Sequence, residues 1–272
     1  MSMSGSMGLD DWFVDEVGIT FGVIGPWRLK TVYEPVYERR GDMLNFVALR
    51  ATSALERGGR PIEPNAVGTL LTAGELWQAR RLAGELAIRN LVLADSEEPV
   101  PTTIVPVAFP PDRLAAGLDH LVRLANLAEV GAEKLVFDLS GTDPLARGRA
   151  LSRPGLNIRH ALDLASAAEI CDTQERPEIL RVPEEWARRL LSSGQLALQM
   201  RRLATVLGRD GRHIQLEGVN TPGLLRAALS SGAERLHGVL LAPSIRAGTE
   251  PDRRSLSIPE LLSRGDTGEG IA

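Results

Sequence analysis

The stretch Gly211–Pro243, GRHIQLEGVNTPGLLRAALSSGAERLHGVLLAP, decides the fold. Its first run, RHIQLEG, is typical of a buried strand, TPGLLRAALSSG predicts a helix, and RLHGVLLA predicts a second strand. One carboxylate, Glu217, stands at the end of the first strand. A strand–helix–strand unit predicts a parallel sheet, and a carboxylate at the mouth of a barrel built from such units is usually there for chemistry.

Short apolar strands alternate with helices outward from this stretch. The turn residues ERRGD separate two β-rich runs over residues 30–49, which predicts an antiparallel pair. Thr72 and Glu75 predict the capped start of a helix over Thr72–Leu91, and a single helix is expected from Pro183 to Gly208. Other strands are expected in TTIVPVAF, EKLVFDL, NIRHALDL and PEILRV, and another helix in PPDRLAAGLDHLVRLANLAEVG.

This alternation predicts a (β/α)8 barrel, a fold of about 250 residues. An open doubly wound sheet is the rival architecture. No G-x-G-x-x-G follows the first strand, and the chain begins with an antiparallel pair, so the barrel is favoured. We expect three segments: a disordered tail over 1–14, the barrel over 15–245, and a polar tail over 246–272 with one short helix at the capping pattern SIPE.

The composition is that of an ordinary soluble globular protein, with 43% hydrophobic and 24% charged residues. The net charge of −4 gives no sign of nucleic-acid binding. The sequence shows no signal peptide and no apolar run long enough to span a membrane, so a cytoplasmic location without membrane insertion is expected. The single cysteine, Cys171, excludes an internal disulfide and is expected to be a small core residue.

Several motifs, in the right order, resemble those of the EAL family, bacterial phosphodiesterases that hydrolyse cyclic di-GMP, and their inactive relatives. YEPVYERRGDMLNFVALR resembles the opening YQPI…EALlR, and VPVAFPPDRL resembles vNvSprqL. LVFDLSG resembles lvlEiTE, EILRVP resembles dylKID, LEGVNTPGLL resembles AEGVEteeqL, and GAERLHGVLLAP resembles GcdyiQGyyfsrP. The resemblance spans about residues 19–243 and implies a modified (β/α)8 barrel whose first strand runs antiparallel to its neighbours.

The resemblance also implies which positions would hold two divalent metal ions, and several of them have changed. The EAL glutamate falls on Val47, or on Phe46 if the arginine of the motif is aligned with Arg50. The asparagine falls on Pro106, and the second glutamate of EiTE falls on Gly141. None of these side chains ligates a metal ion.

Three carboxylates are kept, and they are the candidate metal ligands. They are Asp138 in place of the first glutamate of EiTE, Asp163 if ALDLAS is laid on DDFG, and Glu217. Three carboxylates could hold one Mg²⁺ or Ca²⁺, but not easily two ions about 3.5–4 Å apart. The catalytic lysine falls on Arg181, which stays protonated and cannot act as a base. An ion pair between Glu217 and Arg181 is therefore expected in preference to a metal ion.

Ligand binding is the second property that the resemblance bears on. Arg50 falls on a phosphate-binding position of the family, and it is equally readable as an exposed arginine at a strand end. Glu34 replaces a neutral glutamine, which argues against a dianionic ligand. The late glutamine of the family falls on His237, which we expect to be a polar cap on the barrel. The candidate ligand-binding set is Glu34, Arg50, Arg181 and Glu217.

Three functions remain open at this stage. The first is a catalytically inactive EAL-like domain that acts as a regulatory protein-interaction module in bacterial signalling, without a cofactor and with an unknown protein partner. The alternative is a non-hydrolysing cyclic di-GMP receptor. The third, an active metal-dependent phosphodiesterase, requires a different register of the motifs. A homodimer is expected only by analogy with the family.

Overall fold

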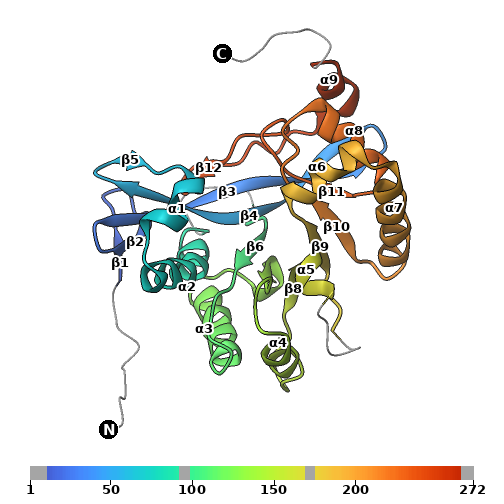
Figure 1. Ribbon diagram of the computed structural model, residues 1–272. Helices are drawn as coiled ribbons and strands as arrows, with labels where there is room; N and C mark the ends of the chain where they lie inside the picture. The colour runs from blue at the N-terminus through green and yellow to red at the C-terminus, as the bar shows by residue number, and fades with distance from the viewer. Residues whose placement is uncertain (1–10, 92–98, 169–174, 265–272) are drawn as a thin grey trace.

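The computed structural model describes residues 11–91, 99–168 and 175–264 (Figure 1). Within them, eight strands close into a barrel in the order β3-β11-β10-β9-β8-β7-β6-β4, and β4 pairs back with β3. These strands are β3 (Trp27–Arg40), β4 (Met43–Arg57), β6 (Thr102–Pro106), β7 (Leu135–Asp138), β8 (Arg159–Asp163), β9 (Ile179–Val182), β10 (His213–Leu216) and β11 (Arg235–Leu236). Only β3 is antiparallel to both of its barrel neighbours, and this confirms the predicted barrel with its antiparallel first strand.

The β3–β4 hairpin is longer than the barrel and reaches out on one side of it (Figure 1). Its turn lies at Gly41, whose positive φ of 63° suits glycine, between the paired residues Arg40 and Met43. A bulge shifts the register, so that Val36 faces Ala48 while Tyr37 faces Phe46. The bulge fixes which β4 side chains face the barrel interior beyond it.

In the described N-terminal part of the chain, three short strands extend the sheet outside the barrel. They are β1 (Trp12–Val14), β2 (Thr20–Ile24) and β5 (Arg60–Pro61). The prediction of a disordered tail over 1–14 was therefore wrong for Trp12–Val14. These residues pair with β2, and the Arg89 guanidinium lies 4.1 Å from the centre of the Trp12 ring. Residues 1–10 lie outside the described residues, as does Cys171.

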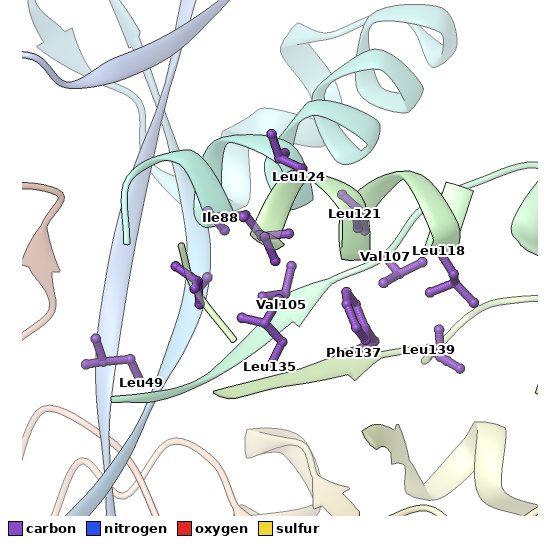
Figure 2. Close-up of a cluster of buried hydrophobic side chains, with 14 of the residues drawn as sticks. Leu49, Ile88, Val105, Val107, Leu118, Leu121, Leu124, Leu135, Phe137 and Leu139 are labelled. Atoms are coloured by element: carbon purple, nitrogen blue, oxygen red, sulfur yellow. The ribbon is translucent and has the colours of Figure 1, made fainter. Parts of the chain in front are cut away.

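Helices cover the outside of the barrel wall. They include α1 (Pro64–Leu70), α2 (Ala73–Arg89), α3 (Leu114–Leu127), the 3-10 turn η1 (Ala132–Lys134), α4 (Pro144–Leu151) and α5 (Leu164–Ala168). The predicted capping box of Thr72 and Glu75 starts α2. Figure 2 shows how leucines of α3, among them Leu118, Leu121 and Leu124, meet Val105 of β6 and Phe137 of β7. This apolar layer holds the helices against the wall.

The helix expected from Pro183 to Gly208 is in fact two helices, α6 (Glu184–Ser192) and α7 (Gly194–Gly208). Ser193 has an extended backbone between them, with φ of −134°. Its hydroxyl accepts a hydrogen bond from the Leu196 N–H at 3.2 Å and so caps α7. Both segments have the helical period that the sequence shows, but this period cannot distinguish a serine inside a helix from a serine that caps a new helix.

The last barrel strand is also shorter than expected, because β11 comprises only Arg235 and Leu236. Gly238 follows with φ of 154°, and a Cβ there would lie 2.3 Å from the Val219 backbone nitrogen. The close approach of two backbone segments therefore ends the strand. Beyond α8 (Pro222–Ser230), the tail adds β12 (Ile245–Arg246), β13 (Leu256–Ser257) and α9 (Ile258–Ser263). The predicted short helix is α9, which buries Leu261 against the wall.

The barrel interior is apolar at its middle. Ile104, Val136, Ala161 and Ile179, one from each of four adjacent strands, form a small buried cluster. None of the helices in the described part of the chain is long and apolar enough to cross a membrane.

Candidate functional site

The candidate site lies at the mouth of the barrel, one layer above this apolar cluster. Every second residue of a strand faces the same side, so the residues two positions further on face the mouth. They are Pro106, Asp138, Asp163 and Arg181, which follow Ile104, Val136, Ala161 and Ile179. The register pairs Pro106 with Asp138 and Asp163 with Arg181. Glu217 comes directly after β10.

Arg181 lies at the centre of this layer and bridges two carboxylates. Its Nε donates a hydrogen bond to Glu217 Oε1 at 2.5 Å, and its Nη1 donates to Asp138 Oδ2. The residue is only 6% exposed, and Glu217 is 7% exposed. The ion pair between Glu217 and Arg181 that the sequence predicts is therefore confirmed, and Asp138 shares it.

A second arginine extends the network towards the rim. Arg50 of β4 donates from Nη1 to Glu34 Oε2 of β3 at 2.7 Å, and its Nε lies 3.5 Å from Glu217 Oε1. The His237 ring lies beside both carboxylates, with Nδ1 3.8 Å from Glu34 and Nε2 3.7 Å from Glu217. Six of the residues singled out in the sequence thus form one cluster: Glu34, Arg50, Asp138, Arg181, Glu217 and His237.

Burial and charge act against each other on the pKa values of the central pair. Burial acts to raise the pKa of Glu217, but His237, Arg50 and Arg181 together hold that pKa well below its usual range. Burial likewise acts to lower the pKa of Arg181, and the negative charges of Asp138 and Glu217 raise it further than burial lowers it. Both groups therefore stay charged, and Arg181 is a fixed cation rather than a proton carrier.

Asp163 is in the mouth layer but serves mainly as a helix cap. Its Oδ1 accepts a hydrogen bond from the Ser166 N–H at 2.7 Å at the start of α5. The second oxygen of Asp138 also meets backbone, because Oδ1 accepts from the Ser140 N–H at 3.1 Å. Gly141 donates its N–H to Ser166 Oγ at 2.9 Å. Both carboxylates are therefore bound into the local backbone, and Asp138 also binds Arg181.

The structure does not bring Val47 or Phe46 to the mouth. Val47 is the residue that the β4 bulge leaves out of the register. The Phe46 ring packs edge-on against Tyr37, 6.2 Å between ring centres, and the Arg253 guanidinium lies 5.8 Å from its centre. Arg50, further along β4, lines the mouth instead.

Two cavities open at the mouth, and Arg50 lines both. The larger, of about 930 Å³, runs from Asp138 and Asp163 along β4 to α2 and the segment after β6. The smaller, of about 260 Å³, lies between Glu34, Glu217 and His237 on the other side of Arg50. The mouth is therefore divided by an arginine that is itself held by two glutamates.

The residues at the mouth do not fit the pair of divalent ions that the EAL resemblance implies. Asp138 and Glu217 already bind the Arg181 guanidinium, whose positive charge stands between them. Pro106 and Gly141 offer no side-chain ligand. In the described ranges, no group of three or more histidine, cysteine, aspartate and glutamate residues is arranged to hold a metal ion.

Sequence reasoning missed several side chains that shape the two cavities. Trp77 and Arg80 of α2 and Phe109 after β6 line the larger one, and Glu184 lines the smaller one. Trp77 and Arg80 lie one turn apart on α2, and Glu184 stands three residues after Arg181. For Phe109 and Glu184 the available signal was their proximity in the sequence to Pro106 and Arg181, whereas no sequence signal marked Trp77 or Arg80.

Comparison with solved structures finds the same fold in several EAL proteins. The EAL domain of Xanthomonas citri FimX, in complex with c-diGMP, superposes with a TM-score of 0.63 at 16% identity over 82% of this chain and 90% of that one. A standalone EAL protein from Vibrio cholerae O395, in its c-di-GMP-bound form, gives 0.59 at 14% identity over 86% and 97%. Klebsiella pneumoniae BlrP1, in a manganese and cyclic di-GMP complex, gives 0.61 at 14% identity over 84% and 59%.

No family model matches the sequence, and no curated protein is significantly similar to it. The structural likeness and the order of the motifs agree on one architecture. The chain therefore has the fold of the EAL domains, a modified (β/α)8 barrel.

Proposed function

We propose that this chain is a catalytically inactive EAL-fold domain that regulates through binding, as a protein-interaction module in bacterial signalling. The proposal rests on one observation, the guanidinium of Arg181 between Asp138 and Glu217. In an active domain, the resemblance places metal ions at these carboxylates and a lysine near the attacking water. Here both carboxylates neutralise an arginine.

The chemistry of arginine supports the loss of hydrolysis. Activating water for attack on a phosphodiester requires a group that lowers the pKa of that water or accepts its proton. Arg181 cannot accept the proton, because its two carboxylate partners raise its pKa further, and the same partners neutralise its positive charge. Arg50 is also bound to two glutamates and adds no base to the mouth. The barrel itself, with its apolar wall of packed helices, is intact and suits a binding module.

A hydrolysis assay tests the inactivity. The full chain is incubated with cyclic di-GMP and Mg²⁺ or Mn²⁺, and the linear product is measured by chromatography beside an active EAL domain. We expect no product, and none from Arg181→Lys alone, because Pro106 and Gly141 still lack ligands. Metal-dependent turnover that Glu217→Ala abolishes would overturn the proposal.

A second candidate is a receptor that binds cyclic di-GMP without cleaving it. The larger cavity favours it, because this space of about 930 Å³ combines the cations Arg50 and Arg80 with the rings of Trp77 and Phe109. Cations and aromatic faces are the groups that hold phosphates and bases. The similar Xanthomonas citri and Vibrio cholerae structures contain this dinucleotide.

Titration calorimetry with and without Mg²⁺ separates the two candidates. Metal-independent binding in the micromolar range, lost in Arg50→Ala and Trp77→Ala, supports the receptor. If a folded sample gives no heat at high dinucleotide concentration, the protein-interaction module is the candidate that remains. Affinity capture with the full chain in the cells that encode it then identifies the partner.

A further inference from the structure

The smaller cavity of the mouth is lined by more carboxylates than cations. Its walls carry the carboxylates of Glu34, Glu184 and Glu217 and only one guanidinium, that of Arg50. Arg181 lies behind Glu217 and is shared with Asp138, and the exposed Arg188 binds Glu184 at 2.6 Å. Four carboxylates thus meet three guanidinium groups, so the cavity keeps a negative charge that disfavours a phosphate within it.

One nitrogen of a buried histidine in the cavity wall lacks a hydrogen-bond partner in the described part of the chain. His237 lines the cavity and is only 5% exposed, yet its Nε2 has no hydrogen-bond partner within the described residues. The nearest carboxylate oxygen, Oε1 of Glu217, is 3.7 Å away, beyond hydrogen-bond distance. Buried polar atoms nearly always have a hydrogen-bond partner in folded proteins, so the Nε2 atom of His237 is available to hydrogen-bond a polar ligand in the cavity.

The cavity also has apolar groups in its walls. Pro35, which is buried, Ala242 and the 66% exposed Val239 line it together with the three carboxylates. Asn220 holds Val239 beside Glu184, because its Oδ1 accepts from the Val239 N–H at 3.1 Å and its Nδ2 donates to Glu184 Oε1 at 3.3 Å. Apolar groups beside carboxylates suit a side chain with a methylene stem and a cationic head.

We infer that the smaller cavity binds a basic side chain, arginine or lysine, of the partner protein. This inference rests on the proposed function, since it gives the chemistry of the group that the interaction module recognises. The head of the side chain donates to Glu34 and Glu217, and its stem lies along Pro35 and Val239. The volume of about 260 Å³ holds one such side chain and excludes a dinucleotide.

The first experiment uses a small probe in place of the partner. Nα-acetyl-arginine amide is titrated into the ¹⁵N-labelled full chain, and the amide resonances of Gly218 and Gly238, which line the cavity, are followed. We expect saturable millimolar binding. The matched probe Nα-acetyl-citrulline amide, which has nearly the same shape without the charge, should leave these resonances unmoved.

Two variants locate the binding. Glu34→Gln removes one negative charge that faces the cation and should weaken binding about tenfold, the loss expected when a charged hydrogen bond becomes a neutral one. The control is Glu185→Gln on α6. It removes a negative charge next to Glu184 but outside the cavity lining, and it should leave the affinity unchanged. Equal shifts with citrulline amide, equal loss in both variants, or unmoved resonances at saturating probe would each overturn the inference.

Failure of this inference is distinct from failure of the proposed function. A chain that neither binds the arginine probe nor hydrolyses cyclic di-GMP refutes the basic side chain and leaves the inactive module standing. A chain that hydrolyses cyclic di-GMP with metal refutes the proposed function, whatever the probe does.

Discussion

Two layers inside one barrel differ sharply although they lie two residues apart on the same strands. The lower layer is apolar, with Ile104, Val136, Ala161 and Ile179. The upper layer carries Asp138, Asp163 and Arg181 on three of these strands, with Glu217 directly after β10. The lower layer is held by packing, whereas the upper layer is held by the matching of buried charges.

The difference teaches that the two layers answer to different constraints. An apolar layer accepts many combinations of side chains with the right total volume. A buried charged layer requires each charge to have its partner, because a lone buried charge costs several kcal/mol. In this barrel two arginines, Arg50 and Arg181, supply the positive charge of the upper layer, so its carboxylates have partners.

The largest effect is expected from the centre of the charged layer. Arg181→Met leaves Asp138 and Glu217 buried without their cation, so we expect the free energy of unfolding to fall by about 3–5 kcal/mol. Urea denaturation at neutral pH, followed by circular dichroism, measures it. The control is Arg188→Met, which removes an exposed partner of Glu184 and should cost less than about 0.5 kcal/mol. Equal losses would abolish the distinction between a buried charged layer and an ordinary surface.

The pH dependence of stability separates the outer wall from the mouth. His160 faces the wall on β8, and burial together with Arg147 lowers its pKa from 6.5 to about 4. Since the folded pKa is the lower one, the unfolded chain binds more protons between these values. Stability from this group is complete above about pH 6.5 and is lost progressively down to about pH 4, by roughly 3 kcal/mol.

Unfolding measurements between pH 7.5 and 4.5 on the wild type and on His160→Gln check this. In the variant, the free energy of unfolding should fall less steeply with decreasing pH in this range. The depressed pKa of Glu217 acts at lower pH, because its contribution is complete above its unfolded pKa and is lost as pH falls through the folded one. An identical slope for the wild type and the variant between pH 6.5 and 4.5 would assign the acid sensitivity of this range to another group.

The barrel could be predicted from the sequence because apolar residues at strand and helix spacing mark most of its elements in order. It also predicted the pair of Glu217 and Arg181, since two opposite charges at the ends of adjacent strands must meet when both are buried. It did not predict the pair of Arg50 and Glu34. That contact depends on the hairpin register, which a one-residue bulge near Val36 sets, and no residue pattern marks the bulge.

The bulge also affects the position that the resemblance assigns to the EAL glutamate. The motifs place it at Val47 or Phe46, but Val47 lies outside the register at the bulge and Phe46 packs against Tyr37. The early end of β11 at Gly238 was missed for a related reason, since it results from contact with Val219 in another segment. Local patterns predict elements, while their ends and registers depend on distant contacts.

A smaller effect is expected in the apolar layer. Ile179→Val removes one buried methylene from the cluster, so we expect a loss of about 1 kcal/mol in the free energy of unfolding. Val206→Ala on α7, where the side chain is exposed, should change it by less than about 0.5 kcal/mol. Both are measured by urea denaturation. A loss in Ile179→Val as large as that in Arg181→Met would mean that the two layers tolerate change equally poorly.

The smallest effect is expected at the rim of the charged layer, where Glu34 meets Arg50. Their side chains are 27% and 21% exposed, so water screens the pair and the Glu34→Gln amide can still accept from Arg50. We expect a loss of about 1 kcal/mol or less in urea denaturation, with wild-type circular dichroism. The contribution to stability would then fall from the centre of the charged layer, which folding requires, to its rim, which can change for binding. A loss as large as that in Arg181→Met would remove this gradient, because the rim would then be as essential to folding as the centre.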